Sequence, residues 1–338
     1  MITNAIEIRQ WNKERIREAV QKHETCTKAD IAHETELSMA TCSTALNEML
    51  ENNEILKINQ IATGIGRPSD LFAYNRDYLH VLCICIYNKD DSNTIELAVA
   101  DALGQSIRTK SFSCDNLSSA SIEALVAEYI AEDPLIRTVG IGIPGVVVDG
   151  VIEFCDMKPL EKVNFVQLLG EQFHVDVIVK NDMNIITYYL YRLQQPRGDF
   201  AAIYYPDVGS AGYVGSGFIV GGHALHGASM LAGEISHVAE AFGISLGEQR
   251  RILGDRAAFR KFAAQMLATV CCTINPSDVV IMGNHITEED VSAIKTHCAS
   301  FISERHLPDI HFSNEVYENY VNGLIRQTLD SILFPFLM

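Results

Sequence analysis

Hydrophobic positions near the start of the chain repeat with a helical period in two successive segments. Asn12 is a candidate N-cap, and Ile16 and Val20 lie on one face of the residues that follow it. Thr27 begins the second segment, and Asp30 stands three residues further on, which is the spacing of a capping box. We therefore predict two short helices, one starting after each cap.

A third helical pattern begins after Ser38, another candidate N-cap, and runs to about Glu51. Cys42, Leu46 and Met49 fall on one face of it, so that face is expected to be buried. The short break between the second and third helices has the length found in a helix-turn-helix. Small hydroxyl and amide side chains on the opposite face are suited to contact bases and phosphates in a major groove. A plain three-helix bundle with a polar outer face accounts for the three helices equally well.

Two strand-like segments, at 55–58 and 71–74, follow the third helix, with Gly66 and Pro68 between them. Three helices followed by a hairpin form a winged helix, which favours DNA binding over a plain bundle. Arg67 at the predicted wing tip is a candidate for the minor groove, although a solvated loop arginine explains it equally well. The candidate DNA-contacting residues are Thr27, Lys28, Ser38, Met39, Thr41, Ser43, Thr44, Asn47 and Arg67.

Strands and helices alternate along the rest of the chain, which is typical of an α/β domain. The first three strands follow one another directly and predict an antiparallel set. No internal repeat of solenoid length is visible in the sequence. Predicted strands lie at 78–87, 95–100, 105–112, 138–147, 175–179 and 279–283, and predicted helices at 121–132, 164–173 and 263–273.

Polar residues follow the predicted strand at 175–179, and α/β folds place ligands at such strand ends. Asp182 there is suited to accept a proton from a sugar hydroxyl. Asn181 and Asp182 are also suited to cap the following helix, and without further context capping is the simpler explanation.

Residues 209–222 contain six glycines, which permit tight turns and a close approach of the backbone to a ligand. The segment lacks a G-x-G-x-x-G run between a strand and a helix, so no dinucleotide site is predicted. Glu234 and His237 follow it three residues apart, a spacing that brings both side chains to one side of a helical turn. They are candidates to hold two hydroxyl groups of a small polar ligand, although a structural role is more common for such a pair.

The composition narrows the class of protein. With 338 residues the chain is long enough for two or three domains. No apolar run approaches the ~20 residues of a membrane span, and the first residues lack the apolar stretch of a signal peptide. We therefore expect a cytoplasmic protein with no membrane partner. The nine cysteines are an odd number without C-x-x-C pairs, which indicates buried thiols rather than disulfides or a zinc site.

The net charge of −17 argues against a general binder of polyanions. Residues 1–75 hold eight Lys and Arg against eleven Asp and Glu, so even the predicted DNA-binding segment has a net charge of 8 − 11 = −3. Contact with DNA must therefore come from the placement of individual side chains, and non-specific affinity is expected to be weak.

Five segments of this chain, in this order, resemble the ROK family (repressor, open reading frame, kinase), in particular its xylose-repressor and N-acetylglucosamine-repressor type. They are the helix-turn-helix TKADIAHETELSMATCSTALNEML, the wing GIGRP, the strand and turn VGIGIPGVV, the element KNDMN and the block GSGFIVGGHALHGASMLAGEISH. The resemblance runs from about Asn12 to the last residue.

The resemblance implies a winged helix-turn-helix over 1–75, followed over 76–338 by an actin-like, hexokinase-like domain of the α/β class. The two lobes of that domain are expected at about 76–185 and 186–338. The resemblance also implies that a sugar binds in the cleft and that Asp182 matches the catalytic base of the family's kinases. The implied sugar contacts are Asn181, Asp182, Glu234 and His237.

Two segments depart from the kinases of this family. Those kinases hold ATP phosphates in an Asp-x-Gly-x-Thr loop, whereas residues 85–91 read CIYNKDD. A second Gly-Thr-Gly turn is replaced by SAGY at 210–213. Without a loop whose successive backbone N–H groups bind phosphate, the protein cannot position ATP as a phosphate donor. We therefore expect no catalytic residue and no cofactor, and Asp182 is interpreted as a hydrogen-bonding ligand residue.

Three further departures from the family concern its zinc site, its sugar pocket and its DNA-contacting helix. The zinc-binding cysteines that relatives carry after the position of His237 are missing from 238–245, so no structural zinc is predicted. Ser236 replaces a glycine, which alters the shape of the pocket. Met39 and Thr44 stand where relatives often have a basic residue, which implies an unusual operator or a modest affinity for it.

The sequence thus predicts a homodimeric or homotetrameric repressor without kinase activity, whose partners are operator DNA and a sugar or sugar phosphate effector. One alternative is an active sugar kinase with a DNA-binding extension. The other is a regulator whose sugar pocket is vestigial.

Overall fold

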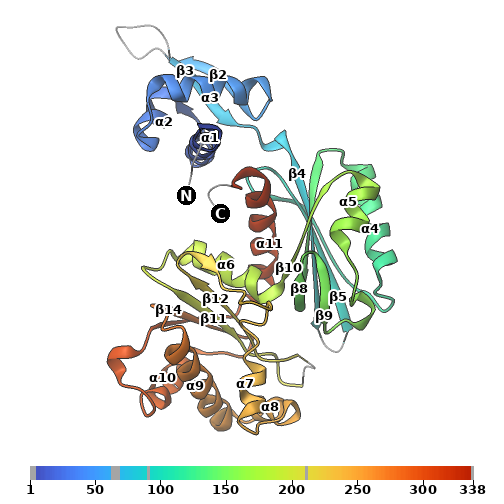
Figure 1. Ribbon diagram of the computed structural model, residues 1–338, viewed down its shortest axis with the longest axis vertical. Helices are drawn as coiled ribbons and strands as arrows, with labels where there is room; N and C mark the ends of the chain where they lie inside the picture. Colours follow the sequence, from blue (N-terminus) through green and yellow to red (C-terminus); the bar gives the residue numbers. More distant parts are fainter. Residues whose placement is uncertain (1–4, 62–68, 90–91, 210–211, 336–338) are drawn as a thin grey trace.

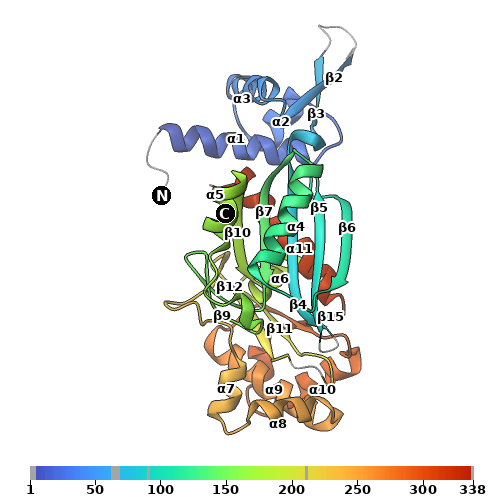
Figure 2. The same cartoon turned by 90° about the vertical axis from the view of Figure 1, so that its right-hand side faces the viewer.

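The computed structural model describes residues 5–61, 69–89, 92–209 and 212–335. A small N-terminal module lies at one end, followed by two α/β lobes (Figure 1). In a view turned by 90°, α1 is seen to lie across the end of the first lobe, between that lobe and the rest of the module (Figure 2).

The N-terminal module consists of three helices and a three-stranded sheet of order β1-β3-β2. Its core is formed by apolar residues of all three helices, including Ile16, Ile31 and Leu46. This is the arrangement of a winged helix, as predicted. The elements are α1 (Ala5–Gln21), β1 (Cys26–Thr27), α2 (Lys28–Thr35), α3 (Met39–Glu51), β2 (Ile55–Ile61) and β3 (Ser69–Tyr74).

Two of the three predicted helix starts are confirmed. Thr27 and Asp30 form a capping box at α2, and the Ser38 hydroxyl accepts a hydrogen bond from the N–H of Thr41 at α3. The prediction for Asn12 was wrong, because α1 begins at Ala5 and Asn12 lies inside it. Arg9, in the part of α1 before Asn12, pairs with Glu48 of α3, a contact that no local pattern reveals.

Lobe one is built on a five-stranded sheet of order β10-β7-β4-β5-β6. β4, β5 and β6 are antiparallel, as predicted, and β7 and β10 run parallel to β4. The strands are β4 (His80–Lys89), β5 (Ser92–Ala100), β6 (Ser106–Ser113), β7 (Ile136–Ile143) and β10 (Asp176–Asn181). Two helices, α4 (Ser119–Glu132) and α5 (Phe165–Phe173), share a core with one face of this sheet. Because α11 covers the other face, eight successive residues of β4 are buried and the strand has no polar face.

The strand predicted at 138–147 is divided in two. β7 ends at Ile143, and after Pro144 a separate hairpin forms from β8 (Gly145–Val148) and β9 (Val151–Cys155). The sequence predicted that the strand runs into a turn at Pro144 and Gly145, but it did not predict the hairpin of β8 and β9 that follows. The hairpin brings residue 156 toward the end of β10, next to the predicted ligand residues.

Lobe two has a sheet of order β13-β12-β11-β14-β15, with β11, β12 and β13 antiparallel and β14 and β15 parallel to β11. The two lobes therefore have sheets of the same topology, an internal duplication that the sequence does not reveal. The strands are β11 (Phe200–Tyr204), β12 (Gly215–Val220), β13 (His223–Ala224), β14 (Asp278–Met282) and β15 (Asp309–Ser313). The helices are α7 (Ser236–Ala241), α8 (Leu246–Leu253), α9 (Arg256–Thr273) and α10 (Glu288–Cys298), and short 3-10 turns occur at Arg76–Tyr78, Lys158–Leu160 and Glu304–His306.

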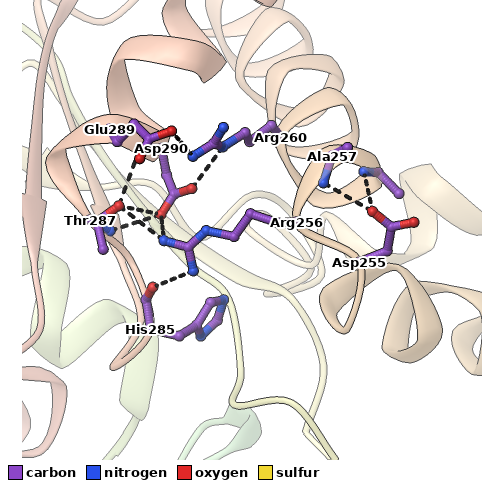
Figure 3. A network of polar contacts seen from close by, with 9 residues as sticks. Asp255, Arg256, Ala257, Arg260, His285, Thr287, Glu289 and Asp290 are labelled. Atoms are coloured by element: carbon purple, nitrogen blue, oxygen red, sulfur yellow. Dashed lines mark hydrogen bonds and ion pairs between the residues drawn. The ribbon is translucent and has the colours of Figure 1, made fainter.

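A polar network joins α9 to α10 (Figure 3). Arg256 and Arg260 both pair with the buried carboxylate of Asp290, which also accepts a hydrogen bond from the N–H of Thr287. Glu289 pairs with Arg260 from the exposed side. These contacts fix the angle between the two helices and have a structural role.

Two helices cross between the lobes. α6 (Asp182–Gln194) follows the last parallel strand of lobe one and packs against β11 and β12 of lobe two. α11 (Val316–Leu333) follows the last strand of lobe two and packs against β4 and β7 of lobe one. The boundary expected near residue 185 falls inside α6, because each lobe contributes a helix to the other. In the part of the chain that the structure describes, no helix has the length and apolar character of a membrane span.

Candidate functional site

A cavity of about 200 Å³ lies where the two crossing helices begin. Its walls come from the end of β10 and the first turn of α6, from β12 and the turn before α7, and from the first turn of α11. Pockets for drug-sized ligands measure ~300–1,000 Å³, so this cavity suits a smaller molecule.

The four residues predicted to bind a sugar all line this cavity, although they come from separate segments: Asn181, Asp182, Glu234 and His237. Asn181 is the N-cap of α6, accepting a hydrogen bond from the N–H of Asn184 at 2.9 Å. Its amide also donates to the carbonyl oxygen of Gly145 at 3.0 Å. Asn181 therefore caps the helix, which was the simpler explanation of the sequence pattern. The cap also places Asp182, the first residue of α6, beside the cavity.

Three carboxyl groups meet around the cavity. Burial raises the pKa of Asp182 to about 8, although the N–H of Met183 donates to it at 2.7 Å. The carboxyl groups of Glu234 and Asp156 contribute to this rise in the pKa of Asp182. Burial also raises the pKa of Glu234, and a nearby His237 opposes that rise. A charged carboxylate here is thus destabilised by desolvation and by its neighbours.

Asp156 was missed by the sequence analysis. It follows the unpredicted strand β9 and lines the cavity. Asp156 is an exposed residue, yet desolvation by the surrounding atoms raises the pKa of its carboxyl group. No signal in the sequence distinguished this aspartate from the many others.

Glu234 and His237 are arranged somewhat differently from the prediction. Glu234 precedes α7, while His237 lies within it and contacts Glu240 at 3.0 Å. The N–H of His237 nevertheless donates to the carbonyl oxygen of Glu234 at 3.3 Å, so the two residues share one turn. Both side chains therefore reach the cavity from lobe two.

Tyrosine rings form another part of the cavity wall. Tyr87 of β4 stacks on Tyr317 of α11 with 4.4 Å between ring centroids, and Tyr320 lies next to them. Flat apolar faces beside carboxyl oxygens suit a ligand that carries both C–H and O–H groups. Residues 85–89, where the resemblance led us to expect a phosphate loop in kinases, continue as regular strand to Lys89, paired with β5. Asp90, Asp91, Ser210 and Ala211 lie outside the described residues.

The candidate DNA-contacting residues all fall on the N-terminal module, except Arg67, which lies outside the described residues. Met39, Thr44 and Asn47 are exposed on α3. Several of the others make local hydrogen bonds. Thr27 caps α2, Lys28 donates to the hydroxyl of Ser43 at 2.8 Å, and the hydroxyl groups of Ser38 and Thr41 lie 2.9 Å apart.

A groove between α1 and α3 includes two of the candidate residues, Thr41 and Thr44. Arg9 and Lys13 of α1 line the same groove, and both pair with Glu48 at 2.8 Å. The two basic side chains of this groove are therefore partly neutralised within the module. Among the residues described, no group of three His, Cys, Asp or Glu side chains is arranged to hold a metal ion.

A winged-helix module joined to two lobes with duplicated sheets defines the class: an N-terminal winged helix followed by an actin-like domain with a cavity between its lobes. Residues 92–248 match the model of the ROK family, the family that the sequence resembles.

Two solved structures show the same fold. A ROK family transcriptional regulator, a homologue of the E. coli MLC protein, superposes on 97% of this chain and 98% of its own, with a TM-score of 0.72 at 14% identity. A ROK family glucokinase from Streptomyces griseus, in complex with glucose and AMPPNP, superposes on 75% of this chain and 99% of its own, with a TM-score of 0.55 at 17% identity. The regulator thus extends over the N-terminal module as well.

One curated relative is similar in sequence. It is described as a candidate xylose repressor from Caldicellulosiruptor sp. (strain Rt8B.4) and is 22% identical over 251 residues. The match covers 70% of this chain and 60% of the relative's length.

Proposed function

We propose that this protein is a cytoplasmic, sugar-responsive transcriptional regulator that represses carbohydrate-utilisation genes and has no kinase activity. The observation that carries the proposal is the combination of a winged helix with an interlobe cavity lined by Asp182, Glu234 and Tyr317. Similarity to a regulator of the same fold over nearly the whole chain supports it, as does the relative described as a candidate repressor.

The proposed mechanism couples two sites. A homodimer or homotetramer presents two winged helices, with domain boundaries at 1–75 and 76–338, to an inverted-repeat operator. A sugar or sugar phosphate in the cavity draws the lobes together and changes the spacing of the two heads. The lobes meet at the cavity through the crossing helices, so closing the cavity is the motion that a ligand would favour. No metal or cofactor takes part.

An operator-shift assay tests the proposal. DNA from upstream of the protein's own gene and of neighbouring sugar genes is titrated with and without a panel of sugars and sugar phosphates. Specific binding that one ligand weakens or strengthens is expected. Failure to bind any of this DNA would contradict the proposal.

A variant of α3 makes the assay specific. Asn47 is exposed on the face expected to meet the major groove, and losing one base contact costs about 1–3 kcal/mol of binding free energy. Asn47→Ala is therefore expected to weaken operator binding by that amount. Asn116→Ala, an exposed asparagine of lobe one, is the matched control and leaves binding unchanged.

One observation favours a second function, that of an active sugar kinase. Burial gives Asp182 a pKa of about 8, which suits a general base for a sugar hydroxyl, and a glucokinase shares the fold. The regular strand through Lys89 favours the regulator, because it offers no glycine turn to hold phosphates. A coupled ADP-release assay with common hexoses decides between them. Turnover that Asp182→Asn abolishes would identify a kinase.

A thermal-shift screen with sugars separates a working cavity from a vestigial one. A ligand at 100 times its Kd stabilises the folded protein by roughly 2.7 kcal/mol. The regulator proposal expects a shift with at least one sugar, whereas a vestigial cavity gives none.

A further inference from the structure

Helix α11 connects the cavity to the N-terminal module. Val316, Tyr317 and Tyr320 in its first two turns line the cavity. Its 18 residues span about 27 Å at a rise of about 1.5 Å per residue. Its last turn lies beside α1, in the corner between the module and lobe one (Figure 1).

At the module end, one buried arginine binds two parts of the molecule. The Arg17 guanidinium donates to the main-chain carbonyl of Leu333, the last residue of α11, and to the carboxylate of Glu54, which follows α3. It also lies over the ring of Phe334, 5.8 Å from the centroid. The carboxylate of Glu54 accepts a second hydrogen bond, from the Tyr74 hydroxyl of β3 at 3.4 Å.

This contact resists rearrangement. The last carbonyl groups of a helix lack partners within the helix, and a buried cation is a favourable donor for them. Arg17 and Glu54 are 8% and 0% exposed, so separating either from its partner leaves an unpaired charge away from water. A displacement of the end of α11 is therefore transmitted to α1 and to the residues after α3.

At the cavity end, α11 is packed closely against lobe one. A Cβ at Gly142 of β7 would lie 2.6 Å from the Tyr320 ring, and the Tyr320 hydroxyl donates to the carbonyl oxygen of Ile86. Tyr317 stacks on Tyr87 of β4. A ligand that moves these two tyrosines thus moves the first turns of α11 relative to the sheet.

We propose that Arg17 is a positioning residue that couples the cavity to the DNA-binding module through the carboxyl end of α11. The proposal rests on the function proposed above for the cavity and the module. In this arrangement the ligand acts on Tyr317 and Tyr320, α11 shifts as a rigid unit, and the link from Leu333 through Arg17 to Glu54 changes the orientation of α3.

The test compares operator binding by full-length Arg17→Lys with that of the unmodified chain, using the sugar that gives the largest thermal shift. Lysine keeps the charge that Glu54 requires but has one ammonium in place of a guanidinium fork, so it does not bind Glu54 and Leu333 together. Allosteric coupling typically changes affinity 5–150-fold, so the operator Kd of the unmodified chain with sugar should differ from its Kd without sugar by a factor in that range. In Arg17→Lys we expect the two Kd values to lie within about twofold of each other. The thermal shift caused by the sugar should be retained.

The ratio separates coupling from stability, because a purely structural role changes both operator Kd values together and leaves their ratio unchanged. An unchanged ratio in Arg17→Lys overturns the proposal. Arg326→Lys is the matched control. Arg326 lies on α11, its guanidinium lies 5.5 Å from the centroid of the same Phe334 ring, and it pairs with Asp330 of its own helix. This variant should keep the ratio of the unmodified chain.

Hydrogen exchange on the unmodified protein gives a second measurement that does not depend on a variant. Sugar binding is expected to change the exchange of residues 14–20 and 328–333 together with that of the cavity segments. Changes confined to the cavity overturn the proposal. If no sugar shifts the unmodified protein, or no operator is bound, the function proposed above fails and is distinguished from a failure of this link.

Discussion

Asp182 shows how one side chain responds to its surroundings. Its carboxyl group lines the cavity together with Glu234 and Asp156, and burial raises its pKa to about 8, with a smaller contribution from those two carboxyl groups. At neutral pH the unliganded protein therefore holds a proton at this site most of the time. A protonated carboxyl group donates one hydrogen bond and accepts others, so it can bind a ligand hydroxyl in either direction.

This shift has a consequence for stability. The carboxyl group of aspartate in an unfolded chain has a pKa of about 3.9, so between about pH 4 and 8 the folded state binds more protons than the unfolded state at this position. The contribution of Asp182 to the free energy of unfolding therefore falls as the pH rises through that range. Asp182→Asn should make stability less dependent on pH and stabilise the unliganded protein at pH 8.

Urea denaturation at pH 5 and pH 8 measures this difference. Asp115→Asn, an exposed aspartate of lobe one, controls for the loss of one negative charge. If Asp182→Asn loses as much stability between the two pH values as the unmodified chain, the proposed protonation of Asp182 is wrong.

Single residues were predicted only where a local motif or the family resemblance pointed to them. The caps Thr27 and Ser38 followed from spacing alone. Asp156 was missed because it follows a short hairpin that the apolar pattern does not resolve. The contact of Arg17 with Leu333 joins residues 316 positions apart, and no periodicity carries such information.

Among the elements, α11 depends on glycines in the strand beneath it. A Cβ at Gly140 of β7 would lie 2.1 Å from the Thr328 hydroxyl oxygen and 3.2 Å from a Leu324 methyl carbon. Thr328 is fully buried and donates to the carbonyl oxygen of Leu324, so it has no free direction in which to move. The backbone of β7 and the helix therefore approach as closely as they do only because residue 140 has no side chain.

Gly140→Ala is expected to destabilise the protein by about 1–3 kcal/mol, the usual cost of overpacking a filled core. Gly247→Ala, within α8, places its methyl group in open space and should be neutral or stabilise by about 0.5–1 kcal/mol through helix propensity. Chemical denaturation of both variants measures the difference. Equal stability of the two would mean that α11 does not pack on β7 as described.

In lobe one most strands and helices were predicted from apolar runs, because strands buried on both faces are nearly continuous in hydrophobic residues. In lobe two the predicted strands and helices include only β14 and part of α9. The order of the strands was not predicted from these runs. The pairing of strands depends on how their apolar faces pack against helices from distant parts of the chain. The two sheets reach the same topology with different sequences and different intervening helices.

At the scale of the whole molecule, the distribution of charge determines how strongly the proposed binding to DNA depends on salt. The net charge is −17, and the pair of cations on α1 nearest α3, Arg9 and Lys13, is bound to Glu48. Few cations are thus available to displace counterions from DNA, and affinity should depend only weakly on salt. Under the proposed function, specificity for an operator therefore has to come from base contacts made by side chains of α3.

Glu48→Gln should release Arg9 and Lys13 from their shared carboxylate. Each additional phosphate contact steepens the slope of log K against log salt by about 0.9, so this variant is expected to steepen it by about 1–2 per module and to strengthen non-specific binding. Titrations at several salt concentrations measure the slope. Glu289→Gln, which loses an exposed pair with Arg260 in lobe two (Figure 3), is the control with the same change of charge. A slope that responds equally in both variants would show that the effect is not local to α1 and α3.

The exchange of helices between the lobes also determines what a shortened chain can do. A protein that ends before Val316 lacks the cover for β4 and β7, and their buried apolar side chains face water. A protein cut between α6 and β11 yields two pieces, each of which carries a helix that belongs on the other. Neither half is therefore an independent folding unit, and during synthesis the sheet of the first lobe stays uncovered on one side until α11 has been made.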